Sequence, residues 1–237
     1  MGFEHPEYMF NRGHWKKVEE YKGMQPIVYP YHEIGDERTY MTDWLKDKTI
    51  EFIQRPHTSP FCFMVSFPDP HPPYVVRTPY SDMYDPDDMP IPDTFRQKNL
   101  PRWADERQIY KRNPRCQEDW LRHVKAQYCG MVKLIDDCVG QILRCLEERG
   151  ILDETIIVFT TDHGDYIGEH GLMGKNMLYE TVYRIPLLIR WPEKIRRGTV
   201  IEEIVSTVDF QQTLLGLIGI KPCGREQGND ASPLLRG

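Results

Sequence analysis

Residues 155–180 read TIIVFTTDHGDYIGEHGLMGKNMLYE, and this stretch decides the fold class. Its first seven residues are a run of β-branched and aromatic side chains of strand length, which predicts a strand covered on both faces. Asp162 and His163 follow at once, and Gly164 lets the backbone turn sharply behind them. Ligands of open α/β sheets bind beyond the carboxyl ends of the strands, so this turn is the first candidate site.

Strand and helix patterns alternate around this stretch. They predict two further strands, at 61–67 and 185–190, and three helices, at 37–54, 117–149 and 209–218. Pro56 stops the first helix and Gly150 the second. The order of the elements predicts an α/β fold with a mostly parallel sheet and helices on both faces.

The chain is long enough for one substantial domain. It has 237 residues, of which 40% are hydrophobic, and it shows no internal repeat. Most of its 19 prolines fall between Pro56 and Pro114, so 68–115 is expected to be an irregular, proline-rich excursion over the surface. We therefore expect a single domain over 1–237.

Charge and cysteine usage narrow the functional classes. A net charge of -6 argues against binding to nucleic acid or to a membrane surface. The sequence has no signal-peptide pattern and no apolar run of membrane-spanning length, so neither is expected. The six cysteines lack zinc or redox spacing. Three of them, Cys129, Cys138 and Cys145, fall in a predicted helix as free thiols, which favours the cytoplasm.

Four polar residues are candidates for chemistry. Asp162 and His163 offer a carboxylate and an imidazole, which together make half of a metal site; the alternative is a loop cap beside a surface histidine. His71 lies in a proline-stiffened turn that suits a proton donor or an anion ligand, although it could merely pack on Tyr74. Lys175 follows a glycine-rich stretch that can approach an oxyanion, but lysines in such loops are commonly just solvated.

Taken in order, five motifs change that balance. They are SFPDPHPPY at 66–74, TDHG at 161–164, GEHG at 168–171 with GK at 174–175, YE at 179–180, and RIPL at 184–187. This series closely resembles the sulfatase family of the alkaline-phosphatase-like superfamily, and the resemblance runs over nearly the whole chain. It implies an alkaline-phosphatase-like α/β fold.

The resemblance also assigns roles. Asp162 and His163 would be ligands of a divalent cation, usually Ca²⁺ in this family; the nitrogen of His163 leaves Mg²⁺ or Mn²⁺ open. His71 and Lys175 would be catalytic residues that bind the sulfate, and His71 could protonate the departing alkoxide. The substrate would be a sulfate ester of a small molecule or a carbohydrate.

Family features that do not occur in this sequence qualify that assignment. Sulfatases attack with a formylglycine made within a Cys-x-Pro-Ser-Arg-like motif, and none of the six cysteines has those followers. We therefore expect a central fragment, incomplete at both ends and inactive alone, with an exposed sheet edge through which it self-associates. Two alternatives remain open: a phosphonate monoester hydrolase or phosphodiesterase of the same superfamily, and a non-catalytic module that binds an anion or a partner.

Overall fold

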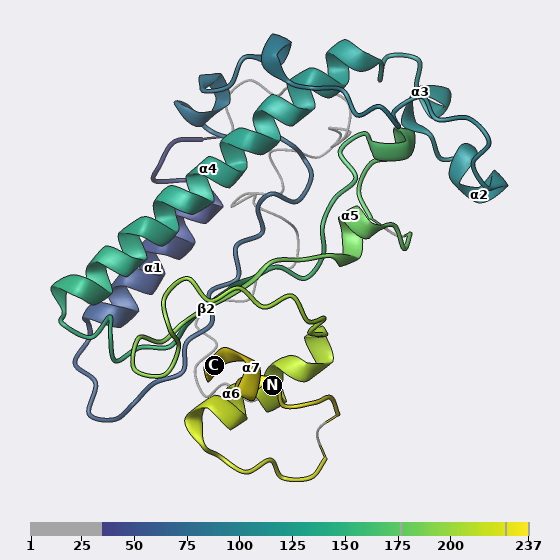
Figure 1. Cartoon of the computed structure of the whole chain (residues 1–237). Coiled ribbons are helices and arrows are strands. Elements are labelled where there is room, and N and C mark those ends of the chain that lie inside the picture. Colours follow the sequence, from purple (N-terminus) through teal and green to yellow (C-terminus); the bar gives the residue numbers. More distant parts are fainter. Residues whose placement is uncertain (1–34, 176, 226, 237) are drawn as a thin grey trace. The chain divides into compact units, whose positions relative to one another are not determined.

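The computed structural model describes residues 35–175, 177–225 and 227–236. They fall into two compact units, and the chain passes from one unit to the other three times: after residue 148, after residue 161 and after residue 185. Unit 1 contains 35–148 and 162–185; unit 2 contains 149–161 and the residues from 186 onward. The single domain over 1–237 stays a prediction. Figure 1 shows the course of the chain.

Unit 1 is mainly helical. Its elements are α1 Met41–Gln54, η2 Tyr80–Asp82, η3 Pro86–Asp88, α2 Arg102–Asp105, α3 Ile109–Arg112, α4 Glu118–Glu148, η4 Glu169–Gly171 and α5 Glu180–Tyr183. Helix α1 begins at Met41 because 36–39 instead form a turn, in which the Asp36 carboxylate accepts from the Arg38 and Thr39 amides. It ends at Gln54, because a residue before proline avoids the helical region. The expected excursion over 68–115 contains η2, η3, α2 and α3.

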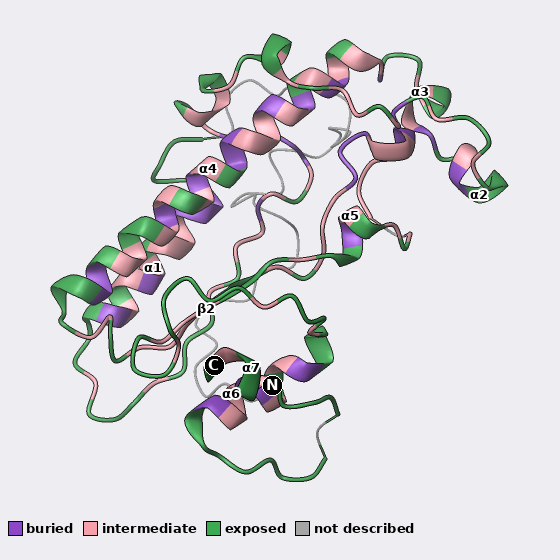
Figure 2. Ribbon diagram, viewed as in Figure 1, coloured by how far each residue is buried: buried purple, intermediate pink, exposed green. Residues whose placement is uncertain are grey.

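The core of unit 1 forms along α4. This 31-residue helix presents a buried stripe that includes Leu121, Met131, Leu134 and Cys138, and α1 lies alongside it (Figure 2). Val75 and Val76, from the segment after His71, join that core. The loop that carries a candidate site residue is therefore packed directly on the main helix.

Unit 2 holds the strands. Its elements are β1 Ile157–Thr160, β2 Leu187–Arg190, η5 Thr207–Asp209, α6 Phe210–Ile218 and α7 Ser232–Arg236. Thr160 pairs with Leu187 and Ile157 with Arg190, in an antiparallel register. Because the chain leaves β1 at Thr160 and returns at its pairing partner, the two strands must run in opposite directions. The expectation of a mostly parallel sheet is not met by this ladder.

The predicted strand at 61–67 is wrong: the structure describes all seven residues, and none of them is in a strand. Its aromatic side chains pack on α1 instead: the Phe63 ring stacks on Phe52 at 4.4 Å between centroids, and Phe61 meets the same ring edge-on at 5.2 Å. An apolar run becomes a strand only where another strand satisfies its backbone groups. The predicted helices at 37–54, 117–149 and 209–218 and the other two strands are present with shifted ends.

Within the described residues, no helix combines the length and the apolar composition needed to cross a membrane. Helix α4 is long enough but amphipathic.

Candidate functional site

The turn after β1 places Asp162 and His163 side by side. His163 Nε2 lies 3.5 Å from Asp162 Oδ2, and the His163 amide donates to Asp162 Oδ1 at 2.9 Å. His163 Nδ1 lies 2.8 Å from the Gly164 carbonyl, to which it must donate, so the neutral ring carries its lone pair on Nε2. Asp162 is 84% exposed and His163 30%. The arrangement presents one oxygen and one nitrogen toward a shared position.

Gly164 is required by a close approach. Its amide donates to the Val182 carbonyl at 2.8 Å. A Cβ at this position would lie 1.9 Å from the Thr181 carbonyl oxygen. Thr181 and Val182 both belong to α5. Only glycine lets α5 seat directly behind the Asp162–His163 pair.

His71 lies in an exposed turn closed by its own amide, which donates to the Pro68 carbonyl at 3.0 Å. Its Nδ1 donates to the Pro72 carbonyl at 2.7 Å. Nε2 is therefore the ring nitrogen that can exchange a proton with, or donate to, a bound anion.

Asp165 joins the candidate segments, and sequence reasoning missed it. One carboxylate oxygen accepts from the Tyr74 hydroxyl at 2.6 Å, and the other accepts from the Gly174 amide at 2.9 Å. Tyr74 is three residues from His71 and Gly174 precedes Lys175, so one carboxylate connects the segments of His71 and Lys175 to the turn of Asp162 and His163. Burial, reinforced by the charge of Asp165, raises the pKa of Tyr74 well above its usual range, which keeps its hydroxyl a donor.

Lys175 is partly buried at the end of the glycine-rich loop. Within 35–175, 177–225 and 227–236 its ammonium forms no hydrogen bond or ion pair with another side chain. An ammonium without a side-chain partner is available to an external anion.

Comparison with known proteins decides the family. The family model described as Sulfatase matches residues 5–220. The chain belongs to the sulfatase family. It is 32% identical to an arylsulfatase of Clostridium perfringens over 191 residues, which covers 76% of this chain and 38% of that protein.

Solved structures show the fold of the same superfamily. The structure of BT4656 in complex with its substrate D-glucosamine-2-N,6-O-disulfate has a TM-score of 0.74 and 25% identity, covering 84% of this chain and 52% of that one. A phosphonate monoester hydrolase of Agrobacterium radiobacter has a TM-score of 0.74 and 26% identity, covering 98% and 48%. The likeness confirms the alkaline-phosphatase-like fold class. The chain spans about half or less of the length of each of these relatives.

Sulfatases generally use a divalent metal and a formylglycine. The Asp162–His163 pair fits such a metal in part: its oxygen and nitrogen converge, and Gly164 and α5 support it from behind. Among the described residues no group of three or more His, Cys, Asp or Glu side chains gathers into a metal site.

A cleft of about 680 Å³ opens beside this turn in the sulfatase chain. It is lined by Glu169, His170, Tyr179, Glu180, Thr181 and Arg184. The His170 ring stacks on Tyr179 at 4.1 Å between centroids, and Arg184 donates to Glu180 at 2.8 Å. Because Thr181 also touches Gly164, the cleft adjoins the candidate metal ligands.

Proposed function

We propose that this chain supplies the cation-binding and sulfate-binding groups of a sulfuric ester hydrolase. One observation carries the proposal: the Asp165 carboxylate binds the Tyr74 hydroxyl and the Gly174 amide while lying three residues from Asp162. It ties the His71 and Lys175 segments to the turn of the two candidate ligands. A compact tetrahedral anion needs that convergence of imidazole, ammonium and cation.

Each residue has a role suited to its chemistry. Lys175 contributes a fixed positive charge toward the sulfate oxygens. His71, with Nδ1 held by the Pro72 carbonyl, binds the ester through Nε2 and carries the proton that the departing alkoxide needs. Asp165 and Tyr74 act on the reaction only by holding these two segments in place.

Asp162 and His163 would hold the divalent cation, with further ligands from outside the described set. A bound cation supplies positive charge that offsets the negative charge developing on sulfate oxygens during S–O cleavage. His163 can serve because its Nδ1 hydrogen bond to Gly164 keeps the metal-binding lone pair on Nε2.

Calorimetric titration of the 237-residue chain with Ca²⁺, Mg²⁺ and Mn²⁺ tests the cation site. Asp162→Asn should weaken cation binding at least about tenfold. Its stability should stay within about 0.5 kcal/mol, since the side chain is 84% exposed. Asp93→Asn, an exposed carboxylate in the proline-rich excursion, is the matched control. Equal affinity in both variants would contradict the assignment.

The second candidate is phosphonate monoester hydrolysis, because the Agrobacterium radiobacter hydrolase covers 98% of this chain. Methyl sulfate and the monomethyl ester of methylphosphonate are both monoanions of similar size, so they make a fair comparison. We expect tighter binding of methyl sulfate, followed through the ring signals of His71 by NMR. A clear preference for the phosphonate would favour the second candidate.

The relatives also suggest a substrate class. BT4656 acts on D-glucosamine-2-N,6-O-disulfate, and a relative of this chain is an N-acetylglucosamine-6-O-sulfatase of Bacteroides thetaiotaomicron. We propose a sulfated carbohydrate as the substrate, with its sugar beside the cleft of Tyr179 and Arg184. Loss of binding when methyl sulfate is replaced by glucosamine-6-sulfate would speak against it.

A further inference from the structure

The segment 69–77, here called the His71 loop, is fastened to the first turn of α1. Three side chains from that turn form hydrogen bonds or an ion pair with the loop: Tyr40, Thr42 and Asp43. Neither the fold class nor the family assignment gives these three residues a role. They belong to no candidate site described above.

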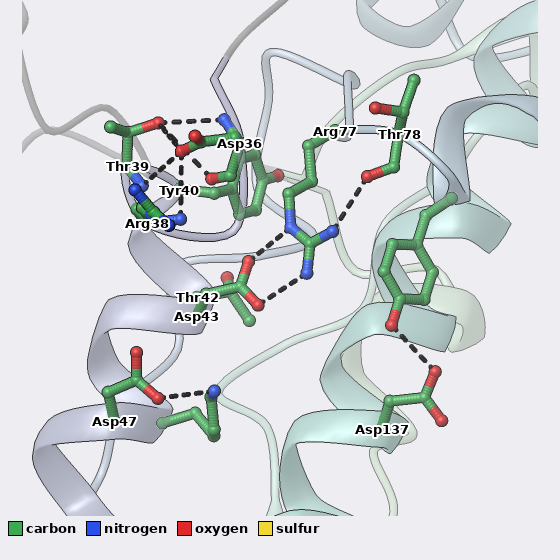
Figure 3. Close-up of polar contacts among 12 residues, drawn as sticks. Asp36, Arg38, Thr39, Tyr40, Thr42, Asp43, Asp47, Arg77, Thr78 and Asp137 are labelled. Carbon is green, nitrogen blue, oxygen red and sulfur yellow. Dashed lines mark hydrogen bonds and ion pairs between the residues drawn. The ribbon is translucent and has the colours of Figure 1, made fainter.

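The contacts hold both ends of the loop. On one side, the Thr42 hydroxyl donates to the Asp69 carboxylate at 2.6 Å. On the other side, the Asp43 carboxylate accepts two hydrogen bonds from Arg77, one from Nε at 2.6 Å and one from Nη2 at 2.7 Å. Figure 3 shows this paired contact, in which two nitrogens of the Arg77 guanidinium face the two oxygens of the Asp43 carboxylate and the third donates to the Thr78 carbonyl. The Tyr40 hydroxyl donates to the Val75 carbonyl at 3.1 Å between these two points.

These contacts are shielded from water. Thr42 is fully buried, Asp69 is 6% exposed, and the side chains of Arg77 and Asp43 are 10% and 4% exposed. Buried, charge-assisted and bidentate hydrogen bonds are the strongest and most directional of those that proteins form. The two ends of the loop are thus held more firmly than a surface loop requires for stability alone.

The His71 side chain has little else to orient it. Within the described residues its own hydrogen bonds are local, to the Pro68 and Pro72 carbonyls. Asp69 lies two residues before it and Arg77 six after, so the direction of the imidazole is set by how these ends are held.

We infer that Thr42 and Asp43 are positioning residues for His71, acting through Asp69 and Arg77. The inference rests on the proposed function for the role of His71 in sulfate binding. It adds that the geometry of this anion ligand is controlled from helix α1. Removal of the Thr42 hydroxyl should release the loop at its Asp69 end while the Asp162–His163 turn stays intact.

The test compares Thr42→Val, which removes the hydroxyl at constant shape, with Thr42→Ser, which retains it. Asp47→Asn, on the same helix with an exposed side chain, is the control. Each full-length variant is titrated with methyl sulfate and, separately, with Mn²⁺, while NMR follows the His71 ring. Thr42→Val should weaken methyl sulfate binding about tenfold and shift and broaden the ring signals. Thr42→Ser and Asp47→Asn should stay within about twofold of the parent, and Mn²⁺ affinity should be unchanged in all three.

A purely structural role for Thr42 would lower methyl sulfate and Mn²⁺ affinity together, and that result would overturn the inference. Unchanged His71 signals in Thr42→Val would also overturn it. If Thr42→Val does not fold, Asp43→Asn, which retains a hydrogen-bond acceptor for Arg77, must shift the ring signals instead. If the parent chain shows no response to methyl sulfate, the proposed function fails, but the ring signals still decide whether α1 positions His71.

Discussion

The His71 loop and the Asp162–His163 turn are held in different ways. The His71 loop is fixed by buried side chains of α1, among them the Asp43–Arg77 pair and Thr42. The turn is fixed mainly through its backbone, where Gly164 contacts α5, and Asp162 remains 84% exposed. An anion ligand must point in one direction before the anion arrives, whereas a cation can itself draw together flexible oxygen and nitrogen ligands. Under the proposed function, this difference would make His71 a preformed sulfate ligand, and it would leave the cation site to be completed on binding.

The largest expected effect comes from breaking the buried ion pair. Asp43→Ala leaves the Arg77 guanidinium, 10% exposed, without its carboxylate and should cost about 3–5 kcal/mol of unfolding free energy. Urea denaturation measures it. Asp47→Ala removes an aspartate whose side chain is 60% exposed and should cost no more than about 0.5 kcal/mol. Similar losses in the two variants would mean that the His71 loop is held no more firmly than the surface.

The pH dependence of stability should report on Asp69. Burial, helped by the charge of Asp43 and opposed by the hydrogen bond from Thr42, raises the pKa of Asp69 from 3.8 to about 7. The folded state then holds a proton that the unfolded state releases. Its stabilisation is complete below about pH 4 and is lost as the pH rises toward 7, by up to about 4 kcal/mol in all.

Asp69→Asn should remove that dependence, because an amide does not titrate. Denaturation at several pH values between 4 and 8 compares the variant with the parent, and only the difference between their slopes matters. Parallel slopes would show that Asp69 is ionised throughout and that the His71 loop is less isolated from water than its burial suggests.

Tyr74→Phe tests the link between the two regions. Deleting the hydroxyl leaves the Asp165 carboxylate without its 2.6 Å donor and should cost about 1.5–3 kcal/mol. Under the proposed function it should also weaken methyl sulfate binding, since the segments of His71 and Lys175 are joined through Asp165. Tyr84→Phe is the control, because within the described residues the Tyr84 hydroxyl makes no hydrogen bond. Loss of stability with unchanged sulfate affinity would mean that the link is structural only.

Gly164→Ala should have the smallest effect on stability, about 1–3 kcal/mol, because the new Cβ would lie 1.9 Å from the Thr181 carbonyl oxygen and α5 must move. Cation affinity should fall with it, as His163 shifts. Gly140→Ala, on α4 with nothing within 4 Å, should be neutral or stabilising by up to about 1 kcal/mol. Calorimetry and urea denaturation measure both. Unchanged cation binding in Gly164→Ala would show that the turn does not depend on its contact with α5.

Local patterns predicted the elements that depend on local physics. The apolar periodicity of 117–149 appears as α4, Glu118–Glu148, and Pro56 ends α1 as expected. The run at 61–67 did not become a strand, because its apolar content does not supply a pairing partner. Local patterns also could not predict that β1 and β2 pair antiparallel. That direction depends on where the 26 residues between the two strands bring the chain back to β1.

The candidate ligands could be named from their motifs, but the residues that support them could not. Asp165 directly follows the TDHG motif that contains Asp162, and nothing in its neighbours says that it binds Tyr74, 91 residues away. Thr42 and Asp43 are polar residues of the predicted helix at 37–54, and no local pattern marks them as buried, yet they are.

The sequence by itself determined the family, the helices α1, α4 and α6 and the four candidate residues, because composition, periodicity and motif spacing are properties of neighbours along the chain. The tertiary structure decided which polar groups are buried together and which stay in water. That distinction depends on burial and on contacts between distant residues, which set the strength of hydrogen bonds and the cost of an unpaired charge. It is why the His71 loop is held by α1 and why the Asp162 side chain is 84% exposed.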